Sequence, residues 1–249
     1  MSHAQVYWTP RTVAWYRRAL ERSDYAERVL GVLAALLPTC ATALDVGAGC
    51  GALALPLAAR LRHVTAIEPA SAMAEALREG ARTRALAHLE VVEAAWDDTA
   101  VEPCDLVLCA HVGPLLRPEA AFLREVSSAA RRFVALVQDT GRERDRFFFH
   151  ELYPTLLGRP YGPGCQHEET VAALAALGIT PEVARVSYRS DQPFDDLEDA
   201  CDFWETHLGV SGAQTRGFLR EFLAARLTRE AAGWVAPYRK EVAVIWWAV

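Results

Sequence analysis

Lysine is nearly missing from this chain. Lys240 is the only one, and arginine supplies the rest of the 26 basic residues, which we treat as a compositional bias. The acidic residues number 32, so the formal net charge is −6. A broad nucleic-acid-binding surface needs an excess of positive charge, so this balance disfavours bulk DNA or RNA as a partner. A single tRNA or a protein target stays open.

Long apolar runs and closely spaced cysteines are also lacking. No stretch is long and apolar enough to span a bilayer, and the opening residues MSHAQVYWTPR lack the apolar core of a signal peptide. A cytoplasmic location is therefore the default, in which we expect reduced and mostly buried thiols. Because no cysteines form a Cys-x-x-Cys pair, we also expect no bound metal. The six cysteines are Cys40, Cys50, Cys104, Cys109, Cys165 and Cys201.

Apolar residues, by contrast, are plentiful. They make up 52% of the 249 residues, which is enough for one large α/β domain with a cap or an insertion. Short apolar runs that predict β-strands alternate with helical patterns, which is typical of α/β proteins. Strands are expected at residues 43–46, 63–67, 89–92, 105–110, 133–138, 181–188 and 241–249. Later helices are expected at 119–131, 170–177, 195–209 and 215–231.

The chain is organised around residues 42–61, TALDVGAGCGALALPLAARL. A buried strand ends near Asp45, three glycines follow at alternate positions, and an apolar helical pattern begins. Glycine lets a ligand approach the backbone closely, and a helix N-terminus offers free N–H groups. The residues Gly47, Gly49 and Ala52 also satisfy the dinucleotide-binding pattern, so two kinds of nucleotide cofactor fit this stretch.

The spacing of Gly47, Gly49 and Gly51 after Asp45 resembles the first motif of the class I S-adenosylmethionine (SAM) methyltransferases. This resemblance implies a doubly wound, mostly parallel seven-stranded sheet with helical and aromatic cap insertions. It also implies that the glycine loop, with Ala48, lies against the methionine part of SAM. The acid at the strand end, Asp45, would orient the ammonium group.

Glu68 ends the second predicted strand about twenty residues after the glycine loop, where an acid can hold both ribose hydroxyls of NAD or of SAM. The run from Glu68 to Met73 resembles the methyltransferase pattern in which Pro69 and Met73 flank the adenine. Met73 could equally belong to the core.

Residues 93–98 depart from the family, which often places an aspartate near Ala94 to bind the adenine amino group. Trp96 could instead cover the adenine, with Ala95 supplying a backbone N–H; alternatively, Trp96 plugs the edge of the sheet. The fourth strand ends at Ala110 and His111, which point into the crevice where open α/β sheets bind ligands. A lone histidine is also often structural.

Three excursions from the sheet carry aromatic and histidine residues that neither the core nor the cofactor explains. We expect an N-terminal helical lid at residues 1–40, before a SAM-binding domain at 41–249. Cap insertions are expected at about 140–167 and 192–236. Aromatic walls with polar tips suit an organic acceptor, although packing explains such residues as well. The acceptor-site candidates are Trp8, Tyr16, His150 and Tyr153, with Tyr16 also closing over SAM.

These patterns predict a SAM-dependent methyltransferase that acts on a small or medium organic acceptor and releases S-adenosylhomocysteine. Such enzymes mainly align the acceptor with the S–CH₃ bond, and a base, where one is needed, would be His111 or His150. An NAD(P)-dependent oxidoreductase is the alternative enzyme, but the chain has no Tyr-x-x-x-Lys pair. A SAM-binding protein without turnover is the third hypothesis. A monomer and a homodimer are both compatible with the sequence.

Overall fold

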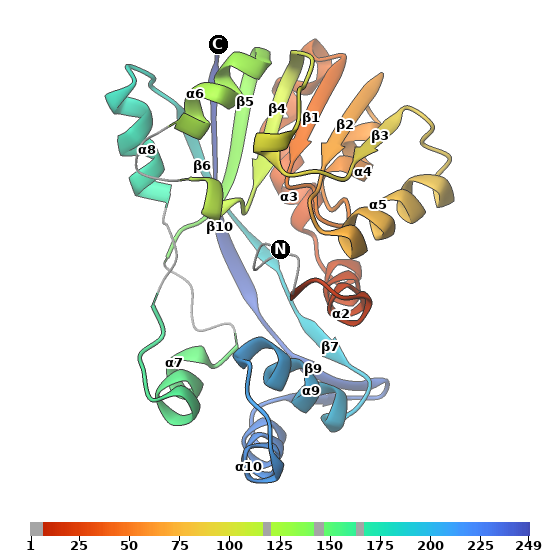
Figure 1. Cartoon of the computed structure of the whole chain (residues 1–249), viewed down its shortest axis with the longest axis vertical. Coiled ribbons are helices and arrows are strands. Elements are labelled where there is room, and N and C mark those ends of the chain that lie inside the picture. The colour runs from red at the N-terminus through yellow and green to blue at the C-terminus, as the bar shows by residue number, and fades with distance from the viewer. Residues whose placement is uncertain (1–6, 117–120, 142–146, 163–166) are drawn as a thin grey trace.

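A seven-stranded sheet forms the centre of the molecule in the computed structural model, which describes residues 7–116, 121–141, 147–162 and 167–249 (Figure 1). The strand order is β3-β2-β1-β4-β5-β10-β6, and β10 runs antiparallel to both of its neighbours. This confirms the predicted doubly wound, mostly parallel fold. The strands are β1 (Thr42–Val46), β2 (His63–Ile67), β3 (Leu89–Val92), β4 (Cys104–Ala110), β5 (Ala130–Asp139), β6 (Glu182–Arg189) and β10 (Arg239–Ala248).

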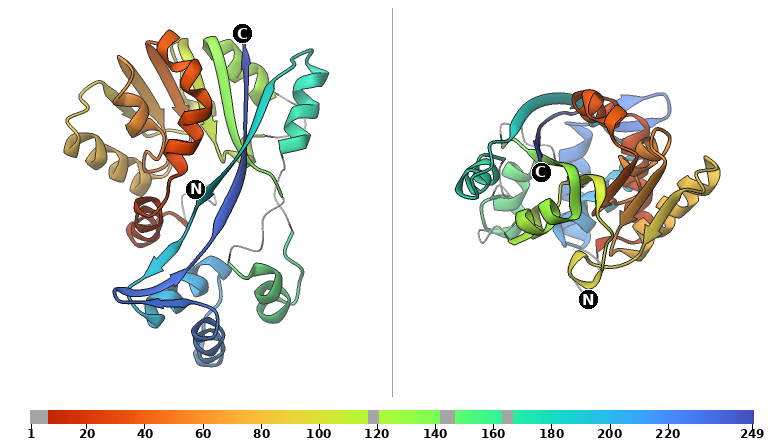
Figure 2. Two further views of the ribbon diagram at one scale, coloured as in Figure 1. Left: turned by 180° about the vertical axis from the view of Figure 1, so that it is seen from behind. Right: turned by 90° about the horizontal axis from the view of Figure 1, so that it is seen from above.

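Helices cover both faces of this sheet, as the view from above in Figure 2 shows. One core cluster joins the sheet to α3 (Tyr25–Val32), α4 (Ala54–Ala58) and α5 (Ser71–Thr83). A second cluster joins the opposite face to α6 (Ala121–Ala129) and α8 (His167–Ala176). Because both faces are covered, the central strands are apolar at nearly every position; Leu106, Val107 and Leu108 of β4 are all fully buried.

A separate cap lies beyond the carboxyl ends of the parallel strands (Figure 1). It comprises α7 (Phe149–Leu152), a π-helical turn (Tyr153–Leu157), α9 (Leu197–Leu208), α10 (Ala213–Ala224) and a small sheet of β7 (Gln192–Phe194), β9 (Gly233–Ala236) and β8 (Thr228–Glu230). Its own core is aromatic, with Phe147, Phe203 and Trp204 in mutual edge contact. Burying each of these rings contributes roughly 1.5–3 kcal/mol, so the cap has a hydrophobic core of its own.

The sequence prediction of one helix over residues 215–231 is wrong after Ala224. Residues Thr228–Glu230 form a strand that pairs with Gly233–Ala236. The hairpin depends on Gly233, which has φ +137°, and a Cβ there would lie 2.1 Å from the carbonyl oxygen of Phe194. Only glycine fits so close to a neighbouring strand, which is why this segment turns back instead of continuing as a helix.

Helix α2 (Pro10–Glu21) connects the sheet to the cap. Thr9 caps its first turn, and Pro10 occupies a position where a missing N–H costs nothing. The indole of Trp15 is 2% exposed and donates to Asp199 of α9 at 2.8 Å, while Gln192 of β7 donates to the Trp15 carbonyl. The predicted lid is therefore attached to the cap.

Some predictions fall outside the described residues: positions 1–6 of the lid, positions 142–146 and 163–166 of the first insertion, and Cys165. Within the described ranges, none of the helices has the length and apolarity that crossing a bilayer requires.

Candidate cofactor and active site

The strand order reverses between β1 and β4, and their carboxyl ends form the edge at which open α/β sheets bind ligands. The glycine loop follows β1, and His111 follows β4. The two segments touch, because a Cβ on Gly47 would lie 2.8 Å from Cγ1 of Val112. The structure thus brings together the glycine loop and His111 as the sequence predicts.

Glycine is needed at the three loop positions for different structural reasons. All adopt positive φ, at +72° for Gly47, +57° for Gly49 and +90° for Gly51. A Cβ on Gly51 would lie 2.3 Å from Cδ1 of Leu77, so this glycine allows α5 to pack closely. A Cβ on Gly49 would meet nothing within 4 Å. Gly49 is therefore the loop position with open space beside it, where a ligand can approach the backbone.

Glu68 holds this loop in place. Its Oε2 accepts the N–H of Gly49 and its Oε1 accepts the N–H of Ala70, both at 2.8 Å. The N–H groups of Gly47 and Ala48 both donate to the carbonyl of Ile67, the last residue of β2. A carboxylate has about four acceptor sites, so Glu68 retains capacity for two further donors, such as two hydroxyl groups.

Asp45 and Glu68 are two buried carboxyl groups at this edge, 2% and 7% exposed. Burial and the charge of Glu68 raise the pKa of Asp45 to about 7, against one favourable hydrogen bond from the Ala54 N–H. Burial also raises the pKa of Glu68. Within the described residues neither forms an ion pair, so the edge is electrostatically suited to a cation.

His111 belongs to a charged cluster that the sequence analysis missed in part. Its Nδ1 lies 3.2 Å from Oδ1 of Asp139, at the end of β5, and Nζ of Lys240 on β10 lies 2.6 Å from the same oxygen. Burial opposes ionisation of Asp139, but His111 and Lys240 outweigh it and hold its pKa well below the usual value. The available signal was that Asp139 ends the strand beside the one that precedes His111.

The comparisons with known proteins agree with this geometry. Residues 43–132 match the family described as a methyltransferase domain, a range that contains the glycine loop, Glu68 and His111. The chain carries a class I methyltransferase domain. The cofactor of this methyltransferase is SAM, and the family match does not favour the NAD(P)-dependent alternative. No curated protein sequence matches the chain.

Solved structures share the methyltransferase's fold. A protein from Bacillus halodurans C-125, described as a candidate methyltransferase, is 16% identical with a TM-score of 0.56, covering 87% of this chain and 97% of its own. The YcgJ protein of Bacillus subtilis is 14% identical with a TM-score of 0.52, over 86% and 95%. The magnesium protoporphyrin IX methyltransferase of Synechocystis PCC 6803 is 14% identical with a TM-score of 0.50, over 87% and 80%. At these identities the likeness shows the fold.

The residues at the edge of the methyltransferase's sheet fit SAM. Its sulfonium and ammonium are cations, which would relieve the repulsion between the buried carboxyl groups of Asp45 and Glu68. Its two ribose hydroxyls match the remaining acceptor capacity of Glu68. The open space beside Gly49 admits a ligand against the backbone. When bound, SAM supplies an electrophilic methyl group.

Several predicted site residues gather under helix α2. Met73 is 3% exposed and clusters with Val13, Cys50 and Ala70, and the partly buried Trp8 and Tyr16 pack against this group. The rings of Trp8 and Tyr16 lie 5.7 Å apart. These predicted lid and adenine residues thus share one cluster, which Cys50 connects to the glycine loop. Pro69 lies between Glu68 and this cluster.

Trp96 packs with residues of α6, in a different cluster from Met73. Its Nε1 donates to Glu125 of α6 at 2.7 Å, and its ring meets Phe122 edge-on at 5.9 Å. This contact resembles the packing alternative more than an adenine cover, and the cofactor role of Trp96 and Ala95 stays a prediction. Ala110, the last residue of β4, pairs with Val137 of β5 directly before His111.

His150 and Tyr153 lie on the cap, in α7 and the turn after it. Both rings pack against Tyr161, with centroids 5.3 Å and 5.0 Å away. Their backbone is joined to the cap core, since Trp204 donates to the Phe147 carbonyl. His111 and His150 thus stand on different parts of the molecule, the sheet edge and the cap.

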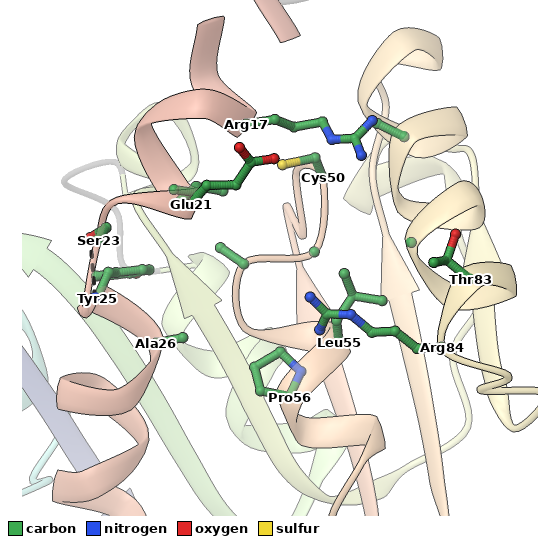
Figure 3. Close-up of a pocket in the computed structure, with 15 residues that line it drawn as sticks. Arg17, Glu21, Ser23, Tyr25, Ala26, Cys50, Leu55, Pro56, Thr83 and Arg84 are labelled. Carbon is green, nitrogen blue, oxygen red and sulfur yellow. Dashed lines mark hydrogen bonds between the residues drawn. The ribbon is translucent and has the colours of Figure 1, made fainter. Parts of the chain in front are cut away.

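A cavity of about 380 Å³ borders the glycine loop on the side that faces α2 and α5 (Figure 3). Figure 3 shows Arg17 and Glu21 of α2 above Cys50, with Arg84, the residue after α5, reaching toward Leu55 and Pro56. The lining includes Gly51 but neither Glu68 nor His111. This cavity is therefore distinct from the strand-end edge that Glu68 and His111 mark.

Proposed function

We propose that this SAM-dependent methyltransferase acts on a small or medium organic acceptor that enters between the sheet edge and the cap. The observation that carries the proposal is the position of the cap beyond the carboxyl ends of β1 and β4 (Figure 1), together with partly buried rings of the cap such as Phe149 and Tyr153. A closed aromatic site aligns an acceptor and excludes water, which methyl transfer mainly needs.

In this proposal, the cofactor is held by the glycine loop, Asp45 and Glu68. Tyr16 and Trp8 cover it from helix α2 and the residues before it. The acceptor contacts His111 from the sheet side and His150 and Tyr153 from the cap. The described cysteines are free thiols, which supports a cytoplasmic location.

The cofactor half of the proposal is tested by thermal shift and calorimetric titration. SAM and S-adenosylhomocysteine should bind and raise the melting temperature by mass action, whereas NAD and NADP should do neither. Tight NAD binding together with no response to SAM would contradict it.

The acceptor half is tested by Tyr153→Ala and His150→Ala. We expect nearly unchanged SAM affinity with lower turnover or weaker acceptor binding, because these residues lie on the cap and not at the cofactor edge. The control is Thr155→Ala, an exposed change on the same turn. If the variants lose stability but keep full specific activity per folded molecule, the residues only pack the cap.

A further inference from the structure

A compact group of ionisable side chains lies at one end of three adjacent strands. His111 follows β4, Asp139 ends β5, and Lys240 lies near the start of β10. Both cationic partners contact one oxygen, Oδ1 of Asp139, at 3.2 Å from His111 Nδ1 and 2.6 Å from Lys240 Nζ. Lys240 is 8% exposed, so this ammonium is buried beside the carboxylate and not spread over the surface.

The backbone of His111 is held in a costly conformation. Its φ is +56°, which costs a non-glycine residue roughly 1–2 kcal/mol, and its N–H donates to the Val137 carbonyl at 2.9 Å. A histidine kept at such a position, at the end of β4, indicates a requirement for the imidazole itself.

The remaining titratable groups around His111 are few in the described part of the chain. The ring of Tyr25 from α3 lies 5.9 Å away, and the ring of Tyr188 from β6 is tilted against Tyr25 at 4.8 Å. Asp45 and Tyr16 act on the same tyrosine from β1 and α2. Asp139 is thus the carboxylate in direct contact with the imidazole.

This contact selects a tautomer. A carboxylate beside Nδ1 favours a proton on that nitrogen, which leaves the lone pair of the neutral ring on Nε2. The ammonium of Lys240 shares the charge of Asp139, so the carboxylate stabilises a protonated ring less than it would alone. The contact with Asp139 therefore keeps the ring oriented, with Nε2 as its basic nitrogen.

We propose that His111 is the general base for methylation of a hydroxyl acceptor, with Asp139 and Lys240 as the positioning residues that set its tautomer and proton affinity. This rests on the proposed function. A hydroxyl is protonated at neutral pH and must lose its proton as it is methylated, whereas a carboxylate acceptor needs no base.

The atoms balance without another reactant. The acceptor oxygen forms a bond to the methyl carbon as the carbon–sulfur bond breaks, and that electron pair stays on sulfur. The hydroxyl proton moves to Nε2 of His111, and the products are a methyl ether and S-adenosylhomocysteine. The imidazolium then returns its proton to water.

The tautomer is tested without an acceptor by ¹⁵N NMR of the histidine rings in the full chain with S-adenosylhomocysteine. His111→Gln assigns the signal. We expect the Nδ1–H form in the wild type and a mixed population in Asp139→Asn. The titration midpoint of His111 should move up by roughly one pH unit in Lys240→Met and down in Asp139→Asn. An Nε2–H ring, or a midpoint that neither variant moves, would overturn the proposal.

The base role is tested with a panel of phenols, alcohols, carboxylic acids and amines, using methyl transfer from labelled SAM. We expect hydroxyl members to be methylated. Asp139→Asn should lower kcat roughly 10- to 100-fold with little change in KM, because oriented base catalysis contributes about 10²–10⁴-fold. The acidic limb of the kcat/KM profile should move to higher pH in Lys240→Met.

The control is Arg239→Met, which removes an exposed positive charge one residue from Lys240 and should leave kcat and the pH profile unchanged. Each variant is first shown to bind S-adenosylhomocysteine. A wild type that binds no SAM refutes the proposed function. A wild type that methylates amines or carboxylates but no hydroxyl, or a folded Asp139→Asn with unchanged kcat, refutes this inference alone.

Discussion

Replacing Asp45 with asparagine should stabilise the free protein at pH 8 while weakening SAM binding. Burial and Glu68 raise the pKa of Asp45 from 3.8 to about 7. At about 1.4 kcal/mol per pH unit, an ionised Asp45 therefore costs roughly 4 kcal/mol of folding free energy. This cost is absent at low pH, grows as the pH rises from 4, and is complete above pH 7.

The asparagine removes this charge but adds a buried amide N–H₂, which costs roughly 1–3 kcal/mol if it stays unpaired. We therefore expect a net gain of about 1–3 kcal/mol at pH 8, or a rise in Tm of roughly 2–12 °C for a chain of this size. At pH 5 the linked cost is only about 1.6 kcal/mol, because Asp45 is protonated in the folded state and ionised in the unfolded chain, so the amide cost cancels it and the variant should gain little or nothing. S-adenosylhomocysteine affinity should fall at pH 8, because the cation loses its carboxylate.

Urea unfolding at pH 5 and pH 8 measures both numbers, and Asp105→Asn is the matched control. Asp105 accepts the N–H groups of Ala41 and Thr42, and these hydrogen bonds hold its pKa below the usual value. Its removal should therefore destabilise the protein by about the same amount at pH 5 and at pH 8, because both lie above the pKa of an unfolded aspartate. If Asp45→Asn is less stable than the wild type at pH 8, or changes stability equally at both pH values, the electrostatic reasoning is wrong.

Four further substitutions test the edge and its surroundings. Glu68→Gln should weaken SAM binding by about 1.5–3 kcal/mol in a calorimetric titration, the scale of hydrogen bonds to a charged group, and unchanged affinity would contradict the ribose role. Gly49→Ala should fold with a cost of about 1 kcal/mol, whereas Gly51→Ala should lose far more stability because its Cβ meets Leu77; equal unfolding midpoints would contradict this. Tyr25→Phe removes a buried hydroxyl that has no hydrogen-bond partner among the described residues and should raise Tm; a lower Tm would contradict this.

The central sheet could be predicted from the sequence because its strands are buried on both faces. A run such as Leu106 to Cys109 has no polar residue, which marks a covered parallel strand and its approximate ends. The glycine spacing after Asp45 and the acid at Glu68 predicted which edge of the sheet binds a ligand, because such an edge needs those residue types at strand ends.

The cap and the partners of His111 depend on contacts between distant segments, and the sequence pattern contains no such information. Residues 228–230 continue a helical pattern, yet Gly233 packs on the carbonyl of Phe194 and turns the chain into a strand. Lys240 belongs to a strand that runs antiparallel to β5, and only that pairing brings its ammonium to Asp139.

Unfavourable features concentrate at the carboxyl ends of β1, β2 and β4. Two buried carboxyl groups there have raised pKa values, and Gly49 and His111 adopt positive φ. Some buried polar groups elsewhere do find partners; Gln192, for example, donates to the Trp15 carbonyl. Proteins retain destabilising features of this kind where function needs them. A ligand that carries positive charge and hydroxyl groups would relieve the electrostatic cost of the two buried carboxyl groups. The same edge should therefore gain the most stability when the cofactor binds, and substitutions that stabilise the free protein there should be the ones that weaken binding.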